Sequence, residues 1–201
     1  RLGRYSFTNC SDLTTVSFNA TSNLARIGYG TFVNCGLTKF TVPANVSTMG
    51  QQVFVDCDAL TAVTFAANSK LESLSAYIFK GCENLRSITF LPGSALISVQ
   101  AHGLEGMAKL TSIDFGDAKV TNIDNFAFRF CTSLSSLNLP ETVTNVGRYA
   151  FYGCESMKEL MLPEKVEHIG SYAFLGTTDL QLYPSAGHVP EYLDEDWDRG
   201  I

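Results

Sequence analysis

One unit of sequence recurs along most of the chain, and its short period limits the folds that the chain can adopt. Each unit has one large apolar anchor, and the anchors are Phe7, Phe32, Phe54, Phe79, Leu104, Phe128, Phe151 and Phe174. Successive anchors lie 25, 22, 25, 25, 24, 23 and 23 residues apart. A unit of that size cannot bury an apolar face by itself, so neighbouring units must stack on one another. The repeat therefore predicts a solenoid of about eight coils.

Two apolar motifs lie between successive anchors and predict the path of each coil. The first is a triplet with the spacing L-x-x-L-x-L, as in Leu85, Ile88 and Phe90. The second is a pair such as Leu96 and Val99, whose second member always lies five residues before the next anchor. The triplet predicts a short strand that pairs in parallel with the strand of the next coil. Prolines end several of these strands because proline has no N–H to donate.

The residues around each anchor predict a tight turn. Stretches such as 148–151 and 171–174 favour one short helical turn, which would direct the anchor and the residue three positions later to the same inward side. Two positions after the anchor the chain carries glycine, asparagine or aspartate in most coils, for example Asn34, Asp56 and Gly81. These residue types tolerate a left-handed backbone, so we expect them to end the turn.

The form A-F-x-x-C-x-x-L-x-x-L-x-L-P, at residues 127–140 and 150–163, resembles the BspA-like (bacterial surface antigen type) leucine-rich repeat family. The resemblance covers residues 1–184. It implies a right-handed superhelix of parallel short strands and short helical turns, mostly β and irregular. In the fifth coil Leu104 and Met107 replace the usual phenylalanine and cysteine, and the last coil is shortened, as expected of a terminal coil.

After Pro184 the repeat stops. Residues 185–201 are acidic and contain the only tryptophan of the chain. We predict that this segment is an acidic C-terminal cap or tail, in which Tyr192, Leu193 and Trp197 cover the end of the solenoid.

Cysteine occupies one position of the repeat, three residues after the anchor. The six cysteines are Cys10, Cys35, Cys57, Cys82, Cys131 and Cys154. Side chains at one position of stacked coils point in the same direction, which is poor geometry for a disulfide. No close cysteine pair of the kind that binds zinc is present. We therefore predict reduced, buried and inert thiols, with no metal site and no cofactor.

Charge and motifs disfavour several classes of function. The net charge is −6, which argues against a nucleic-acid partner because such partners select basic surfaces. The sequence contains no run of about 18 apolar residues, the length that is needed to cross a membrane. The sequence has no Walker, H-E-x-x-H or G-x-S-x-G motif, and none of His102, His168 and His188 has a carboxylate or nucleophile at a readable spacing. We therefore predict no catalytic residues and no enzyme activity.

The outward positions of the strands are the candidate ligand-binding surface. The slot between the last two apolar residues of each triplet gives the candidate residues Thr41, Thr64, Thr89, Asp114, Asn138 and Met161. Such a surface could dock an extended polypeptide or a glycan. It could equally be a solvated β surface, on which threonine is common because it suits a strand.

The resemblance implies a recognition or adhesion module at a cell surface or in a secreted protein, with host or matrix proteins as partners and glycans as a further possibility. A second hypothesis is a structural spacer within a larger secreted protein or enzyme, and a third is a glycan-processing or hydrolase activity carried by the repeats. The chain opens Arg-Leu-Gly-Arg-Tyr, without an initiator methionine or a signal segment. We expect that processing or a boundary removed what came first.

Overall fold

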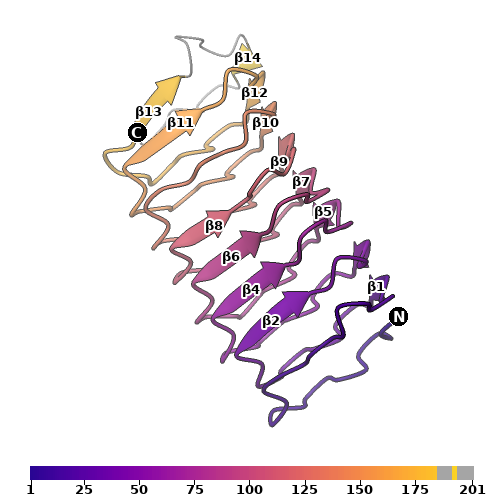
Figure 1. The fold of residues 1–201 in the computed structure, drawn as a ribbon. Helices are drawn as coiled ribbons and strands as arrows, with labels where there is room; N and C mark the ends of the chain where they lie inside the picture. The colour runs from indigo at the N-terminus through magenta and orange to yellow at the C-terminus, as the bar shows by residue number, and fades with distance from the viewer. Residues whose placement is uncertain (185–191, 194–201) are drawn as a thin grey trace.

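The computed structural model describes residues 1–184 and 192–193, which form a solenoid of parallel β-strands (Figure 1). The chain winds from the N-terminus at one end to the C-terminus at the other, and each coil lies beside the next (Figure 1). The eight anchors delimit seven complete turns. No helix occurs among the described residues. The repeat fold predicted from the sequence is confirmed.

The apolar triplets form the longer strands. These are β2 (Lys39–Val42), β4 (Ala62–Phe65), β6 (Ser87–Phe90) and β8 (Ser112–Asp114), followed by β11 (Glu159–Leu162) and β13 (Gln181–Pro184). The first four make one parallel sheet, and β11 pairs with β13 in a second. In β2, β4 and β6 the buried apolar residues alternate with outward residues that are mostly polar, because successive side chains of a strand point to opposite faces.

Two of the predicted strands are absent. Residues 13–18, in the first coil, and residues 134–139, in the sixth, carry the triplet but form no strand. The first coil has a neighbouring coil on one side only. In the coil before residues 134–139, β8 ends at Asp114, whose Oδ1 accepts the N–H of Gly116 (2.9 Å). The sheet is split between β8 and β11.

The apolar pairs form a second set of strands, which the sequence analysis did not predict. They are β1 (Arg26–Ile27), β3 (Thr48–Met49), β5 (Ser73–Leu74), β7 (Ser98–Val99), β9 (Asn122–Ile123), β10 (Asn145–Val146) and β12 (His168–Ile169). All pair in parallel, β1 with β3 and the others in a longer sheet. Each strand has only two residues, so its sequence is too short to show the alternation that identifies a strand.

The predicted helical turn around each anchor is wrong. Left-handed residues lie two positions before and two positions after every anchor, as Tyr149 (φ 55°) and Gly153 (φ 71°) do around Phe151. The N–H groups of Phe151 and Gly153 donate to the carbonyls of Ala173 and Leu175 in the next coil (2.8 and 2.9 Å). A helix would use these N–H groups within the coil, so the bonds between coils exclude it. The predicted left-handed residues after the anchors are confirmed.

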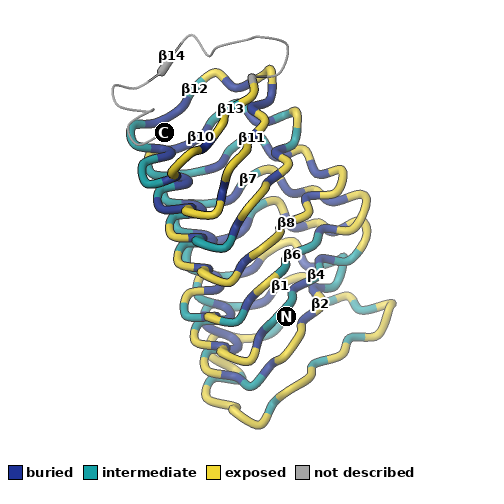
Figure 2. Tube along the Cα trace, turned by 90° about the vertical axis from the view of Figure 1, so that its left-hand side faces the viewer, coloured by how far each residue is buried: buried dark blue, intermediate teal, exposed yellow. Residues whose placement is uncertain are grey.

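The anchors form the centre of the core. Phe54 stacks on Phe79 with ring centroids 5.5 Å apart, and Phe151 stacks on Phe174 at 5.6 Å. Leu104 continues this column without a ring and is fully buried. Figure 2 shows buried stretches recurring at the same place in successive coils. Each coil thus buries its anchor against the coils on either side.

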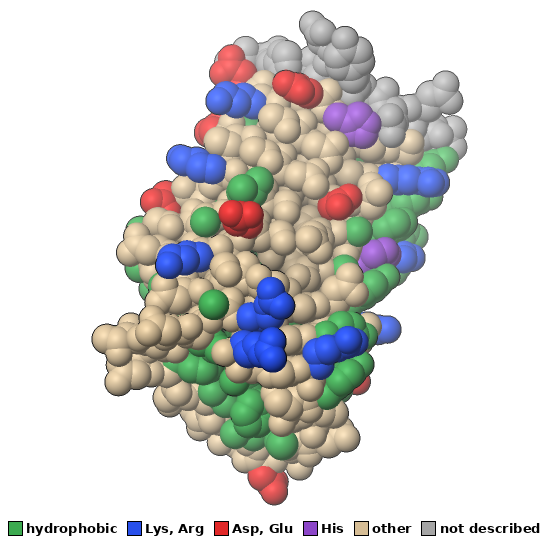
Figure 3. Space-filling model, turned by 90° about the vertical axis from the view of Figure 1, so that its right-hand side faces the viewer, with side chains coloured by type: hydrophobic (Ala, Val, Ile, Leu, Met, Phe, Trp, Pro, Cys, Tyr) green, Lys and Arg blue, Asp and Glu red, His purple; other side chains and the backbone are tan. Residues whose placement is uncertain are grey.

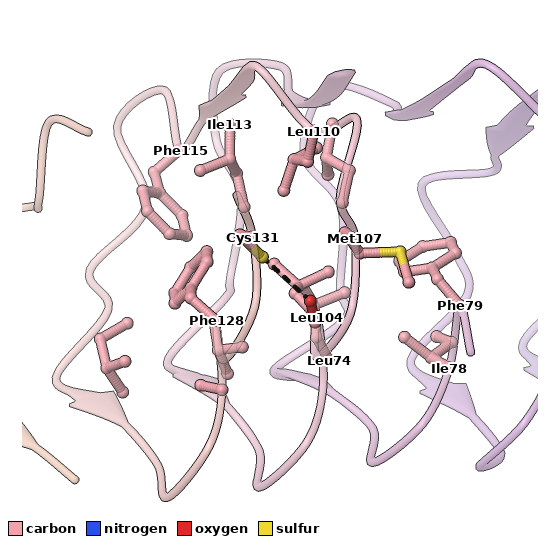
Figure 4. Close-up of a cluster of buried hydrophobic side chains, with 14 of the residues drawn as sticks. Leu74, Ile78, Phe79, Leu104, Met107, Leu110, Ile113, Phe115, Phe128 and Cys131 are labelled. Atoms are coloured by element: carbon pink, nitrogen blue, oxygen red, sulfur yellow. Dashed lines mark hydrogen bonds between the residues drawn. The ribbon is translucent and has the colours of Figure 1, made fainter. Parts of the chain in front are cut away.

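The cysteines form a hydrogen-bonded column beside the anchors. None of the six forms a disulfide. Five are buried, but Cys10 is exposed because it lies in the first coil, so the prediction of burial is wrong for that residue. Each buried thiol donates to the carbonyl of the anchor in the preceding coil. The bond from Cys131 Sγ to the Leu104 oxygen is 3.1 Å long (Figure 4).

Burial keeps the thiols of Cys35, Cys131 and Cys154 protonated, whereas the pKa of Cys57 is lowered, chiefly by a side-chain hydrogen bond with Cys82. Loss of solvent raises the pKa of Cys35 to about 11 and that of Cys154 to about 12, and it raises the pKa of Cys131 well above its ordinary value. The thiolate is the reactive form of cysteine, so these side chains are chemically inert at neutral pH.

The predicted C-terminal cap, residues 185–201, lies outside the described residues except for β14 (Tyr192–Leu193). The backbone of β14 pairs in parallel with β12 and extends the longer sheet of two-residue strands by one strand.

Candidate binding surface

The four-stranded sheet aligns four of the predicted site residues in one row. Thr41 pairs with Thr64, Thr64 with Thr89, and Thr89 with Asp114 in the parallel register. Thr41 and Asp114 are exposed, and the two central threonines are half-buried between their neighbours. We call this row, with its continuation on β11 and β13, the strand face.

The other two predicted site residues lie beyond the break in the sheet. Asn138 is exposed but belongs to no strand. Met161, on β11, is 57% exposed and pairs with Tyr183 on β13, which is 45% exposed. The six predicted residues therefore form one row that is interrupted at Asn138, and its C-terminal end is apolar.

Charge on the strand face lies mainly at its ends. In the adjacent outward slot, Lys39 stands at the N-terminal end and Glu159 at the C-terminal end, with alanine and serine on the strands between them. Asp114 is the acidic member of the row, and its carboxylate also accepts the N–H of Gly116. The centre of the face therefore offers short hydroxyl groups and one carboxylate held rigidly by the turn.

Two hollows open beside the strand face at the two places where strands are missing. One, of about 590 Å³, lies at the first coil and is lined by Ser17, Phe18, Thr41 and Pro43 among others, with no charged residue. The other, of about 380 Å³, lies at the break in the sheet and is lined by Asp114, Asn138 and Glu141. A side chain or a sugar ring of a ligand could occupy either hollow.

The side-chain hydrogen bond of His102 is with a carboxylate and not with a cysteine or serine nucleophile. Its Nδ1 lies 2.6 Å from Oε2 of Glu105, three residues later. The expectation that no histidine has such a partner is therefore wrong. The described part of the chain holds no group of three or more histidine, cysteine or acidic residues that could bind a metal ion. Within the same residues, no helix is long and apolar enough to cross a membrane.

A row of aromatic rings forms one further surface. His102 occupies a slot that holds tyrosine or phenylalanine in neighbouring coils. In the structure it stacks between Tyr77 and Phe126, with both centroid distances 4.8 Å. These three rings are only half-buried. Alignment of the coils by their anchors shows this slot, but sequence alone does not show that its rings remain accessible.

Comparison with known proteins agrees with this architecture. The family described as "BspA type Leucine rich repeat region" matches six copies of its repeat, in residues 1–102 and 60–181. No curated protein matches the sequence.

Several solved structures share the fold. A leucine rich cell surface protein from Faecalibacterium prausnitzii is 22% identical, with a TM-score of 0.58 over 82% of this chain and 52% of that one. A leucine-rich repeat protein of T. pallidum is 20% identical, with a TM-score of 0.61 over 86% and 74% of the two chains. The pneumococcal vaccine antigen PcpA is 18% identical, with a TM-score of 0.52 over 90% and 57%. The chain thus spans about half the length of the Faecalibacterium protein.

Proposed function

Because the chain belongs to the BspA-type leucine-rich repeat family, we propose that it is a non-catalytic recognition module, secreted or exposed at a cell surface, whose strand face binds a protein ligand. Among the similar structures, one is a cell surface protein and another is a vaccine antigen. Both descriptions support a location outside the cell. Host or matrix proteins are the ligands that such a location would offer.

The observation that carries this proposal is the row of in-register outward side chains on four adjacent strands. Threonine and aspartate side chains have few rotamers, so covering them costs little conformational entropy. The paired strands hold them at a fixed spacing of about 4.8 Å. A polar row of this kind suits a hydrated interface of moderate affinity, in which repeated contacts along an extended ligand supply avidity.

A glycan is the second candidate ligand, and the hollow at the first coil favours it. The hydroxyl groups of Ser17 and Thr41 lie there beside the apolar walls of Phe18 and Pro43, without a charge. That combination suits a neutral sugar. An extended polypeptide fits the whole face better, because the described strands carry no outward aromatic ring in the row until Tyr183.

The test begins with a screen of the chain against immobilised extracellular matrix proteins and a glycan array. The double substitution Asp114→Arg and Asn138→Arg then places two bulky cations on the strand face. We expect at least a tenfold loss of affinity for the ligand found, because the Asp114 carboxylate is replaced by a cation and the two arginine side chains obstruct contact with the face. The melting temperature should fall only slightly, because both side chains are exposed and the one bond lost is that from the Gly116 N–H to the Asp114 carboxylate.

The matched control is Glu72→Arg with Gln51→Arg, which makes the same charge changes at exposed positions away from the strand face, Glu72 lying next to β5 of the sheet of two-residue strands. This variant should bind like the parent. Equal binding by the parent and the Asp114→Arg, Asn138→Arg variant would show that the strand face is only scaffold. A ligand found on the glycan array alone would favour the second candidate.

A further inference from the structure

A column of stacked aromatic rings runs along the turns that carry the anchors, outside the strand face. The ring centroids are 4.8 Å apart from Tyr77 to His102, 4.8 Å from His102 to Phe126, 5.3 Å from Phe126 to Tyr149 and 5.2 Å from Tyr149 to Tyr172. The angles between neighbouring ring planes are 19° or less. All five rings are half-buried. We call these five rings, together with Phe130, which like Phe126 contacts the guanidinium of Arg129, the aromatic turn face.

The stacking decides which part of each ring a ligand can contact. His102, Phe126 and Tyr149 are covered on both faces by their neighbours in the column. Their accessible parts are therefore ring edges. The edge of an aromatic ring is the positive end of its quadrupole, whereas the face is negative. This surface therefore disfavours a sugar that stacks on ring faces and favours a negatively charged ligand.

Cationic side chains lie against the same column. The guanidinium of Arg148 is 4.9 Å from the ring centre of Tyr149, and the ammonium of Lys80 is 5.9 Å from that of Tyr77. Neither cation makes an ion pair with a described residue. Both charges are therefore available to a partner.

The side chain of Arg129 makes more contacts than those of Arg148 and Lys80. Its guanidinium carbon lies 4.5 Å from the ring centre of Phe130 and 5.5 Å from that of Tyr152, and its Nη1 pairs with Oε1 of Glu105 at 3.0 Å. Of the three cations in contact with these rings, Arg129 alone pairs with a described carboxylate, that of Glu105, although the chain as a whole carries a net charge of −6. Figure 3 shows hydrophobic side chains gathered along the right-hand edge of the molecule, with basic side chains beside them.

We propose that the aromatic turn face docks an acidic polypeptide segment that also carries apolar side chains. Tyrosine, phenylalanine and arginine are enriched at protein interfaces, where they supply large rigid contacts. Phe130 is 39% exposed and would contact an apolar side chain of the segment. Arg148 and Lys80 would pair with its carboxylates. This surface is distinct from the strand face, so its failure would leave the proposed function standing.

The probe is a fluorescently labelled 12-residue peptide of four Glu-Phe-Asp repeats, titrated into the full chain and followed by fluorescence anisotropy. Neutral (Gln-Phe-Asn) and basic (Lys-Phe-Lys) peptides of the same length serve as comparisons, together with a sulfated glycan. We expect the acidic peptide to bind and the basic one not to bind. The Arg148→Glu substitution should weaken binding by about tenfold or more, because it replaces attraction with repulsion.

Two further variants provide a matched control and a second test of the surface. Lys119→Glu makes the same charge change at an exposed position on the turn after β8, and it should leave binding unchanged. Phe130→Asn removes the exposed ring but keeps a residue that occupies the same left-handed slot at Asn9 and Asn34, and it should weaken binding several-fold while the chain stays folded. The proposal is overturned if Arg148→Glu and Lys119→Glu bind alike, if the neutral peptide binds as well as the acidic one, or if only the sulfated glycan binds.

Discussion

At the scale of single residues, the cysteine position shows what the sequence could and could not predict. Its place in the repeat predicted buried, unpaired thiols, and this is confirmed for five of the six. It did not predict that each buried thiol bonds to the carbonyl of the preceding anchor, because that carbonyl is more than twenty residues away in the sequence. The thiol is therefore both a small apolar filler and a donor between coils.

The bond from Cys131 to Leu104 predicts how substitutions at Cys131 behave. Cys131→Ala leaves the Leu104 carbonyl without this donor and should cost about 1–3 kcal/mol of unfolding free energy. Cys131→Ser keeps a donor, so it should cost no more than Cys131→Ala. The hydroxyl of Thr177, at the same slot of the last coil, is also hydrogen-bonded to a carbonyl, in this case that of its own anchor. Urea titration of both variants measures the two costs. A serine variant markedly less stable than the alanine variant would contradict the role of the thiol as a donor.

The thiol of Cys154 should make the chain less stable at alkaline pH. Burial raises the pKa of Cys154 from an ordinary value of 9.0 to about 12, so the folded chain keeps a proton that the unfolded chain loses. The stabilising contribution is complete below pH 9 and is lost as the pH rises toward 12. At pH 10 the loss from this one thiol is about 1.4 kcal/mol. Urea titrations at pH 7.5 and pH 10 should show the parent losing about that much more than Cys154→Ala. Equal losses would contradict the burial of the thiol.

At the scale of strands and turns, the longer strands were predictable and the short ones were not. The triplet in β4 and β6 alternates over four residues, which is enough to identify a strand and its inward face. The two-residue strands are defined by their pairing with the strand of the next coil. Their own sequence is too short to predict them. The break at residues 134–139 was not predictable either, because these residues carry the same triplet as the coils that do form strands.

The same reasoning applies to the candidate surfaces. The row on the strand face follows from the repeat, so its register was predictable as far as Asp114. The aromatic slot was also visible in the repeat, but the accessibility of its rings depends on left-handed residues such as Tyr77 and Tyr149. Tyrosine rarely adopts that backbone, so propensity alone does not predict it.

The column of anchors predicts which substitutions destabilise the chain most. Phe128 is fully buried and stacks on Phe151, with ring centroids 5.1 Å apart. Phe128→Ala should cost about 3–5 kcal/mol, the usual range for emptying a buried phenylalanine site. Phe130→Asn, two residues away on the surface, should change stability by only about 0.5 kcal/mol. Thermal and urea unfolding of both variants tests this. A cost below about 1 kcal/mol for Phe128→Ala would show that the anchors are not the core.

At the scale of the whole molecule, stacking turns a short repeat into two long surfaces. The strand face presents short polar side chains, and the aromatic turn face presents ring edges and cations. Both surfaces are built from several successive coils, and each coil is held by contacts with its neighbours, so the solenoid acts as a rigid support for extended ligands. This arrangement requires no pocket that encloses a substrate.

Hydroxyl-radical footprinting tests the central claim, that the strand face is the recognition surface. Met161 and Tyr183 are exposed on the strand face, and Phe130 is exposed on the aromatic turn face, so both surfaces carry side chains that oxidise readily. The chain would be oxidised alone and with the ligand identified by the screen, and the modified residues quantified by mass spectrometry. We predict that the ligand protects Met161 and Tyr183 and leaves Phe130 as reactive as before. Protection of Phe130 without protection of Met161 and Tyr183 would contradict the claim.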